Sequence, residues 1–380
     1  MTAHAPTLRR LFPTVFVGRD LIVIGVLGFL ITLGVLAGLA RLWLGLGATT
    51  SLNDTYSWGI WIGFDFLLIA LSGAGFTMAA VGHVLHLHRF HAAVRPAILA
   101  GLMGYVAVLL LLVLDLGRPD RFYHFLIYFN IHSPLFEISW CVLLYSTVLA
   151  LEVSPYLFER LGWKRPVNLF YKLITPITII GVTLSSLHQS TLGTLYLNMP
   201  HRLDALWYTP WLPVQFFVSS ILAGLSVGTL AYIVGAGVAR KHEDPGIARG
   251  LGKGIVGVGL VYLGLKFGDL ILAGEWPRLL AMDKLSLLWW AEIGLGVILP
   301  LLLLTLPGLR SRPETRWLAP VLVIFGLGMN RFDATLFAQH PLNAALYTPH
   351  LLEWFSTAGI LAAAALAWWL GVRVLAVFEK

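Results

Sequence analysis

Ten long apolar segments, separated by short turns, constrain this chain more than any other feature. They cover about residues 21–43, 59–88, 94–117, 133–155, 171–195, 211–239, 250–273, 286–308, 317–336 and 351–376. A membrane-spanning helix needs roughly 20 mostly apolar residues, and helices bond all their own backbone groups in lipid. The sequence therefore predicts an all-α integral membrane protein. We expect an N-terminal segment over residues 1–20 and one polytopic domain over residues 21–378.

Composition supports a membrane protein and narrows the chemistry. Of the 380 residues, 58% are hydrophobic and 12% are charged, whereas a soluble domain has roughly 25% charged residues. The single cysteine, Cys141, gives no disulfide framework and no CxxC pair. Any iron–sulfur cluster is therefore expected in a partner subunit. The net charge of +7 comes from basic residues in short turns, which argues against nucleic-acid binding.

The distribution of Lys and Arg predicts an orientation. These residues concentrate in the N-terminal segment, in the turns that follow even-numbered spans, and at the C-terminus. Basic turns generally stay in the cytoplasm. We therefore expect a multi-pass protein of the bacterial inner membrane with both termini cytoplasmic, no cleaved signal, and the odd-numbered turns in the periplasm.

Ionisable side chains within the spans are the main candidates for function, because they are costly in a bilayer. Most of them fall in the half that we expect to be periplasmic: Asp65, Asp115, Glu137, His188, Lys266, Asp269, Glu292 and Glu353. Three of them, Asp65, His188 and Lys266, lie about 10 Å below the predicted periplasmic surface at a rise of about 1.5 Å per residue. This layer is where we expect the site.

A quinone suits such a layer, because its two carbonyls need hydrogen-bond donors, its ring needs flat neighbours and its reduction needs a proton carrier. Trp58, Trp61 and Asp65 have the i, i+3, i+7 spacing of one helix face. His188 is deep within its span and is followed by Gln189.

Structural roles compete with each of these interpretations. Trp58 and Trp61 could be interfacial belt residues. His188 could bond only to a neighbouring helix. Asp115 with Arg118 could form a helix-end ion pair.

Three further groups also have alternative interpretations. Lys266 and Asp269, at i and i+3, could neutralise each other. Glu292 and Glu353 could be solvated at the water line. The histidines of residues 83–91 could form a lipid-facing rim near the other surface.

The histidine pattern also bears on haem. Two axial histidines must lie on facing helices at equal depth, but His83 and His86 share one helix. On the opposite side only His188 is deep, so we expect neither haem nor a bound metal.

Several polar strings resemble the NrfD/polysulfide-reductase membrane subunits, in particular the HybB-type "cytochrome b" subunits of periplasmic nickel–iron hydrogenases. The likeness runs from about residue 50 to the C-terminus. It rests on NDTYSWGIWIGFD at 53–65, DLGRP at 115–119, LFEISWC at 135–141, LHQSTLG at 187–193, LWYTP at 206–210 and GMNR at 328–331.

The resemblance implies two four-helix bundles, from helices 2–5 at about 59–195 and helices 6–9 at about 211–336, with two flanking helices. It also implies a menaquinone or ubiquinone site near the periplasm, a docked ferredoxin-like iron–sulfur subunit, and a hydrogenase-like or molybdoenzyme-like catalytic subunit. The resemblance implies roles in the quinone site for Asp115 and Arg118 of the DLGRP string. It implies the same for Trp58, Asp65, Glu137 and His188, which lie in the other matching strings.

We therefore expect a quinone-reactive anchor that catalyses only as part of a complex. Asp115 and His188 would bond the quinone carbonyls, while Glu137 and Asp65 would pass protons, with proton translocation left open. An ion- or proton-coupled secondary transporter and a passive anchor are the alternatives.

Overall fold

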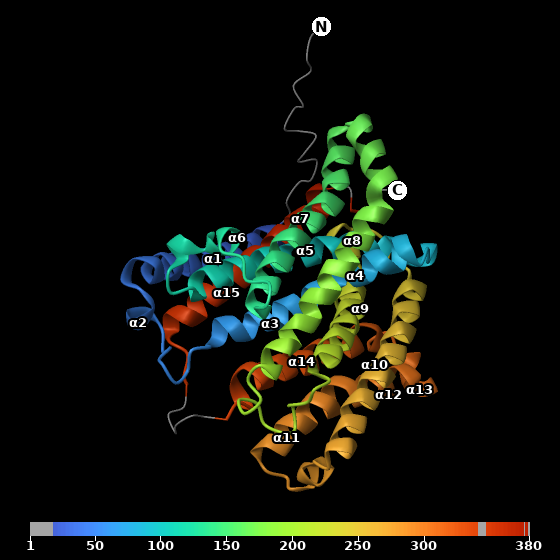
Figure 1. The fold of residues 1–380 in the computed structure, drawn as a ribbon. Helices are drawn as coiled ribbons and strands as arrows, with labels where there is room; N and C mark the ends of the chain where they lie inside the picture. The colour runs from blue at the N-terminus through green and yellow to red at the C-terminus, as the bar shows by residue number, and fades with distance from the viewer. Residues whose placement is uncertain (1–17, 341–346, 376, 379–380) are drawn as a thin grey trace.

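The computed structural model describes residues 18–340, 347–375 and 377–378, and within them the regular elements are helical (Figure 1). Ten helices of this part are long and apolar enough to cross a membrane, so the chain is a multi-pass membrane protein as expected. The expected N-terminal segment over residues 1–20 lies almost wholly outside the described residues.

Six spans are single helices and four contain interruptions or short additions. The uninterrupted spans are α1 (Gly18–Leu44), α7 (Pro134–Leu161), α8 (Lys164–Leu197), α9 (Leu212–Val238), α10 (Pro245–Ala273) and α15 (Leu351–Val374). The second span consists of α3 (Ile60–Ser72), α4 (Ala74–Ala79) and the π-helical turn η2 (Ala80–Val84). The third joins the 3₁₀ turn η3 (His88–Phe90) to α5 (His91–Asp115). The eighth consists of α11 (Lys284–Trp290), the π-helical η6 (Ala291–Ile298) and α12 (Leu299–Thr305). The ninth joins α14 (Thr315–Phe332) to the π-helical turn η7 (Asp333–Phe337).

Short elements lie in the turns: α2 (Leu46–Thr49), η4 (Pro119–Arg121), α6 (His124–Ile127), η5 (Trp276–Leu280) and α13 (Pro307–Arg310). The turns at residues 45–59, 116–133, 198–211, 274–283 and 338–350 follow odd-numbered spans, and we call their side the odd-turn face. The turns at residues 85–90, 162–163, 239–244 and 306–314 form the even-turn face.

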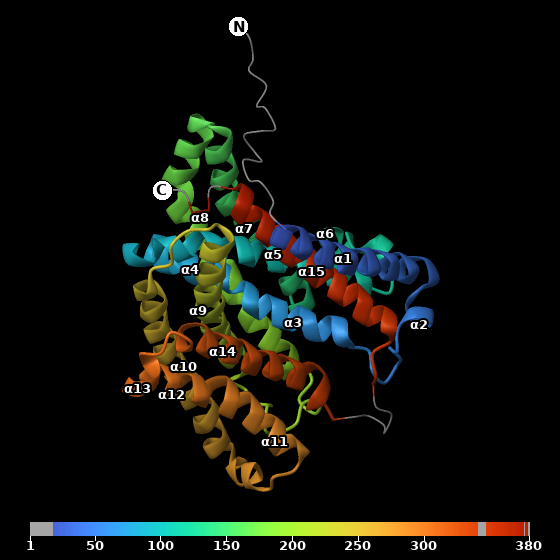
Figure 2. The same ribbon diagram turned by 180° about the vertical axis from the view of Figure 1, so that it is seen from behind.

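We describe the eight inner spans in two sets that follow chain order and call α3–α4, α5, α7 and α8 the first bundle and α9, α10, η6–α12 and α14 the second bundle. Each span contacts at least one other member of its set, and α9 also contacts α3–α4, α5 and α8 of the first bundle. Helices α1 and α15 pack side by side, and α15 also packs on α5, so both outer helices lie against the first bundle (Figures 1 and 2).

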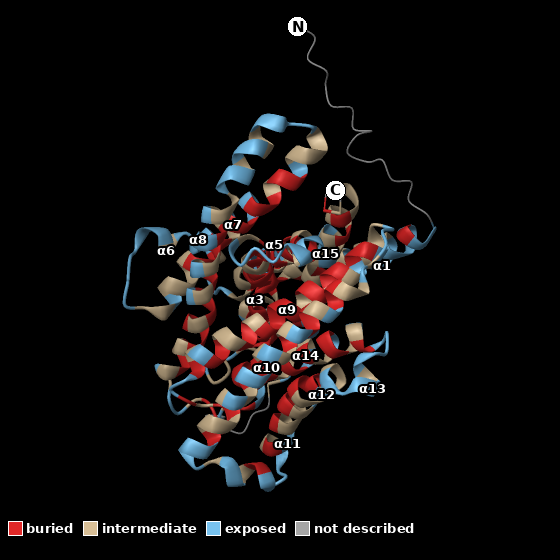
Figure 3. Ribbon diagram, turned by 90° about the vertical axis from the view of Figure 1, so that its right-hand side faces the viewer, coloured by how far each residue is buried: buried red, intermediate tan, exposed pale blue. Residues whose placement is uncertain are grey.

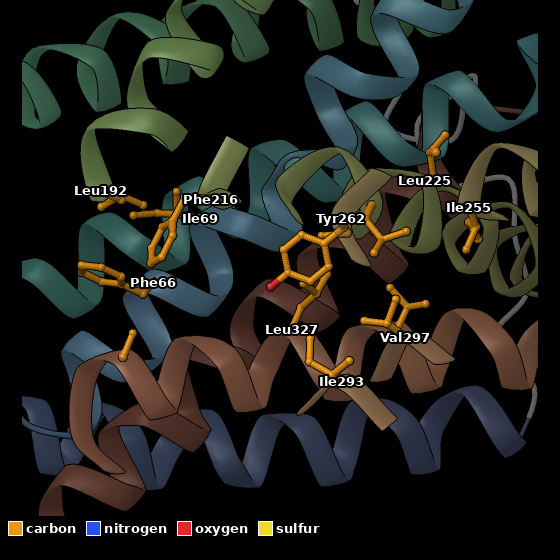
Figure 4. Close-up of a cluster of buried hydrophobic side chains, with 14 of the residues drawn as sticks. Phe66, Ile69, Leu192, Phe216, Leu225, Ile255, Tyr262, Ile293, Val297 and Leu327 are labelled. Atoms are coloured by element: carbon orange, nitrogen blue, oxygen red, sulfur yellow. The ribbon is translucent and has the colours of Figure 1, made fainter. Parts of the chain in front are cut away.

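A shared core joins the two bundles at α9. One cluster of buried side chains runs from Phe66, Ile69 and Leu192 in the first bundle through Phe216 to Ile293 in the second (Figure 4). Burial is greatest along α3 and α9, whereas the outer ends of α7 and α8 are exposed (Figure 3). The core therefore holds the two bundles in a fixed relation.

Glycines allow the closest helix crossings. A Cβ added at Gly296 of η6 would lie 2.2 Å from the Cα of Gly326 on α14, and one at Gly34 of α1 would lie 2.5 Å from the Cα of Gly359 on α15. Small residues permit this approach, which is how helices associate in lipid. The crossing of Gly34 with Gly359 holds α1, which carries Arg41, against α15.

The observed boundaries differ most from the expected ones at α7 and α8. These helices extend beyond the predicted 133–155 and 171–195 and meet at Gly162, whose φ of 73° suits glycine. Their charged extensions reach past the other helices (Figure 1), which is why hydropathy missed them.

Candidate functional site

Two aspartates from neighbouring helices meet near the odd-turn face of the first bundle. Asp65 of α3 is 4% exposed and lies in electrostatic range of Asp115, the last residue of α5. The Oδ1 atoms of both carboxylates are buried without a hydrogen-bond partner among the described residues. Because buried polar atoms are normally bonded, these two are candidates for contact with a ligand or a proton.

The positive charge beside Asp115 comes from α1. Arg41 is buried and interacts electrostatically with Asp115, while it donates to the carbonyl oxygens of Leu114 and Leu116, each at 2.5 Å. Those carbonyls are at the C-terminal end of α5, where a cation is favourable. Arg41 therefore fixes the end of the helix that carries Asp115.

Glu353 completes this group, which we call the acidic cluster (Arg41, Asp65, Asp115 and Glu353). Its carboxylate accepts hydrogen bonds from the backbone of Ser51 at 3.0 Å and His350 at 2.7 Å, and from the hydroxyl of Tyr347. Glu353 is fully buried and interacts electrostatically with Asp115, so the expectation that it is solvated at the water line is wrong.

Tyr347 links the acidic cluster to the turn at residues 338–350. Burial and the bond to Glu353 raise the pKa of the Tyr347 hydroxyl above its usual value. The hydroxyl therefore stays protonated at neutral pH and can donate.

His188 lies deeper in the first bundle. Its Nδ1 is 2.9 Å from the hydroxyl of Tyr105 on α5, and its Nε2 is buried without a partner among the described residues. The ring of Tyr105 packs edge-on against Tyr145 with centroids 4.9 Å apart, and Tyr105 lies in electrostatic range of Asp65. His188 thus does bond a neighbouring helix, but one of its ring nitrogens remains available.

Glu137 and Gln189 bind other helices. Glu137, in the first turn of α7, is half-buried and accepts a 2.7 Å bond from Thr191 of α8. Gln189 donates at 2.8 Å to the carbonyl of Ile69, while its Oε1 is unpartnered within the described ranges. Both residues lie in the same bundle as His188.

The expected shared face of Trp58, Trp61 and Asp65 is wrong for Trp58. Helix α3 begins at Ile60, so Trp58 precedes it and packs near Tyr196, under the guanidinium of Arg202 at 4.7 Å from the ring centroid. Trp61 is buried and its indole donates at 3.1 Å to Ser356 of α15.

Arg118 does not hold Asp115. The chain leaves the helix at Leu116 in an extended conformation, and the exposed Arg118 pairs with Asp120 at 2.8 Å. This pair lowers the pKa of Asp120 to about 2. The expected ion pair of Asp115 with Arg118 is therefore wrong, because the intervening residues turn Arg118 outward.

The three side chains expected in one layer, Asp65, His188 and Lys266, do not lie together in the structure. Lys266 of α10 pairs not with Asp269 but with Glu292 of η6, at 3.2 Å, and both are buried. Asp269 instead accepts a 2.5 Å bond from Thr209. Lys266 therefore belongs to the second bundle, apart from Asp65 and His188, and Glu292 is not solvated.

Glu292 has several donors in addition to Lys266. Trp207 donates to it at 2.7 Å, Asn330 at 3.0 Å and Tyr262 at 3.3 Å. We call Lys266, Glu292 and these three residues the ion-pair cluster.

Two more charged residues of the second bundle lie beside the ion-pair cluster. Arg331 is fully buried, donates to Asn330 and, at 2.8 Å, to Ser219, and lies over the ring of Phe216. Asp333 lies in electrostatic range of Glu292, and both of its oxygens are without partners among the described residues.

Two adjoining pockets open near the acidic cluster on the odd-turn face. The aromatic pocket, of about 490 Å³, has a lining that includes Tyr56, Phe332, Tyr347 and Trp354. The second, of about 390 Å³, has a lining that includes Tyr56, His201 and Arg202. The two pockets share Tyr56, Gln339 and His340.

Polar groups also connect the first bundle to the even-turn face. His83 of η2 is 3.2 Å from the hydroxyl of Thr178, and that hydroxyl donates at 2.7 Å to Glu152, which is buried. Glu152 lies in electrostatic range of Tyr145. The interpretation of the histidines as a lipid-facing rim is therefore incomplete for His83, which contacts Thr178 of α8. In the described part of the chain, no group of three or more potential ligands is arranged to hold a metal ion.

Sequence reasoning missed several of these residues. Tyr105 and Tyr347 look like ordinary aromatics in the sequence, and Arg41 looks like a basic residue at the end of a span. A search for ionisable residues within the predicted spans could have found Arg41, Glu152, Arg331 and Asp333.

The family of this chain follows from its similarity to known proteins. Residues 48–339 match the profile of the family described as "Polysulphide reductase, NrfD". The chain belongs to this family. Among its relatives, a protein of Nitratidesulfovibrio vulgaris is 38% identical over 86% of each chain. The "Probable Ni/Fe-hydrogenase 2 b-type cytochrome subunit" of Escherichia coli is 31% identical over 92% of this chain and 91% of that protein. The "Menaquinone reductase, integral membrane subunit" of N. vulgaris is 28% identical over 88% of this chain and 86% of that protein.

Proposed function

We propose that this protein is the quinone-reactive membrane subunit of a respiratory redox complex. It passes electrons between quinone and an iron–sulfur subunit docked on the odd-turn face, which we propose to be periplasmic. The observation that carries the proposal is the acidic cluster, with its unpartnered carboxylate oxygens, beside an aromatic pocket. Kinship with an N. vulgaris protein named as a menaquinone reductase subunit supports it.

The pocket suits a quinone ring in size and chemistry. Its volume of about 490 Å³ falls in the range of roughly 300–1,000 Å³ usual for small-molecule sites. Phe332 and Trp354 offer flat apolar surfaces, and Tyr347 at the edge of the pocket is bonded through its hydroxyl to Glu353 of the acidic cluster. Phe337 and Trp354 of the lining are also exposed, and we propose that the isoprenoid tail leaves the pocket past them.

The residues of the first bundle would handle the protons. Quinone reduction consumes two electrons and two protons, and oxidation releases them. Tyr347 is bonded to Glu353, which adjoins Asp115 and through it Asp65. Tyr105 and His188 extend this series toward the middle of the membrane. Each member can hold or pass a proton at a named oxygen or nitrogen.

The electrons would arrive from outside the chain. Cys141 is the single cysteine, so the chain cannot bind a four-cysteine cluster. Exposed apolar side chains at Phe122, Tyr128, Phe129 and Ile131 form part of the odd-turn face. This surface is where we propose that the iron–sulfur subunit docks, with the catalytic subunit beyond it.

A second function, proton translocation, has its own observation. The series His83, Thr178 and Glu152 leads from the even-turn face to Tyr145, which packs against Tyr105. With Tyr105, His188 and the acidic cluster, these residues form a series of neighbouring polar groups within the first bundle. We propose that it supplies protons from the cytoplasmic side, where we also place both termini.

The test compares two activities of the assembled complex. Asp115→Asn and His188→Phe should each abolish quinone-linked turnover and leave electron transfer to a soluble dye intact, because the dye takes electrons before they reach this subunit. Asp120→Asn is the matched control, since Asp120 is an exposed carboxylate five residues from Asp115.

The outcomes separate the alternatives. Loss of both activities in the Asp115 and His188 variants would indicate an assembly role, as for a passive anchor. Full quinone-linked turnover in both variants would leave the first-bundle groups free for solute transport and would overturn the proposal.

A further inference from the structure

A basic pocket lies on the even-turn face of the second bundle, far along the chain from the acidic cluster. It has a volume of about 700 Å³ and lies between α10, α12, α13 and the start of α14. Its lining contains four cationic residues and, within the described residues, no carboxylate: Arg249, Lys253, Arg310 and Arg316.

Most of this positive charge is not neutralised. Arg316 pairs with Glu243 at 2.7 Å. Arg249 donates to the carbonyl of Pro245 at 3.2 Å, and neither it nor Lys253 or Arg310 forms an ion pair with a carboxylate in the described residues. Three cations that converge on one cavity repel one another, and an anion in the cavity would remove that cost.

The lining of the basic pocket changes from charged to apolar along α10. Arg249, Lys253 and Val256 are spaced i, i+4 and i+7 on α10, so they line one face of the helix. Val256 is about 16 Å along the helix from its start at Pro245, at about 1.5 Å per residue. On the opposite wall, Leu304 near the end of α12 lies against Gly252, one turn before Val256. The cavity is thus cationic at the membrane surface and apolar inside the bilayer.

We propose that this pocket binds the headgroup and upper acyl chain of an anionic phospholipid. Guanidinium groups bind phosphate oxygens in pairs, and basic pockets between spans at the membrane surface suit anionic headgroups. The apolar wall continues into a membrane-spanning helix, so an acyl chain has a surface to follow. A free phosphate would leave that wall and most of the volume unused.

The test measures lipid binding to the purified full-length protein by native mass spectrometry. Phosphatidylglycerol, phosphatidylcholine and inorganic phosphate are titrated separately. We expect a preference for phosphatidylglycerol that falls about tenfold or more in Arg249→Gln/Lys253→Gln/Arg310→Gln, with phosphatidylcholine binding unchanged. Val256→Trp should also weaken phosphatidylglycerol binding, because it fills the apolar part and keeps every charge.

A matched control separates this site from a general surface effect. Lys164→Gln/Arg165→Gln/Lys172→Gln removes the same charge from exposed residues of the α7–α8 hairpin on the same face, and it should leave binding intact. An equal loss in both triple variants would overturn the proposal in favour of diffuse attraction. Displacement of the lipid by millimolar inorganic phosphate, with no effect of Val256→Trp, would show a free-anion site instead.

Discussion

The two bundles bury polar groups in opposite ways. In the second, the carboxylate of Glu292 has Lys266 and three hydrogen-bond donors around it, and the two terminal nitrogens of Arg331 are bonded while its Nε has no partner among the described residues. In the first, Asp65, Asp115 and His188 each keep a buried atom without a partner in the described residues. Buried ion pairs hold helices together only when they are fully bonded. A buried polar group without a partner destabilises the fold, so we infer that such a group is retained for a chemical role.

Some side chains of the second bundle also have buried atoms without partners among the described residues, and Asp333 is the one with a carboxylate. It belongs to the second bundle, yet both of its carboxylate oxygens are unpartnered among the described residues, and it lies near Lys266 and Glu292. The difference in bonding therefore lies between the acidic cluster with His188 and the ion-pair cluster.

The largest expected effect is on stability in the second bundle. Lys266→Met leaves Glu292 charged and buried, which should destabilise the folded protein by about 3–5 kcal/mol. Denaturant unfolding of the purified protein in detergent measures this change. Lys266→Met combined with Glu292→Gln should recover much of the loss. Equal stability of the Lys266→Met variant and the wild type would show that the ion-pair cluster contributes nothing to the fold.

The next effect should be on turnover in the first bundle, with stability preserved. Asp65→Asn removes a carboxylate that lacks a bonded partner on Oδ1, so its free energy of unfolding should change by less than about 1 kcal/mol. Quinone-linked turnover should fall at least about tenfold, as for the loss of a group that transfers protons. A strongly destabilised Asp65→Asn protein would instead make the acidic cluster a structural element like the ion-pair cluster.

A smaller effect should follow from Glu152→Gln. It interrupts the series from His83 to Tyr145, so proton uptake from the even-turn side should slow several-fold while electron transfer to quinone continues. A pH-sensitive dye trapped in proteoliposomes that contain the whole complex measures the uptake. If uptake and electron transfer change by the same factor, Glu152 has no separate role in proton delivery.

The smallest effect should come from Arg118→Gln. The pair of Arg118 with Asp120 is exposed, and salt bridges of that kind contribute little. The lowered pKa of Asp120 means that any stabilisation is lost only as the pH falls from about 4 toward 2. Between pH 5 and 9 any stabilisation by the pair is fully present, but it is small because the pair is exposed, so unfolding and quinone-linked turnover should stay close to the wild type throughout this range. A large loss of turnover would show that Arg118 contributes to the quinone site.

The amino-acid sequence alone was enough to predict the number of spans and the membrane class. These follow from local composition, because a span must be apolar along its whole length and each ionisable residue in it stands out. Several site residues could be selected in the same way, including Asp65, Asp115 and His188.

The partner of each buried charge depends on how the helices pack. Lys266 pairs with Glu292 rather than with Asp269, and Arg41 rather than Arg118 lies beside Asp115. Spacing along one helix fixes which residues share a face, but it does not fix the rotation of that helix or the neighbour that it meets. Those depend on packing between distant segments, such as the crossing of Gly34 with Gly359 that carries α1 to the first bundle.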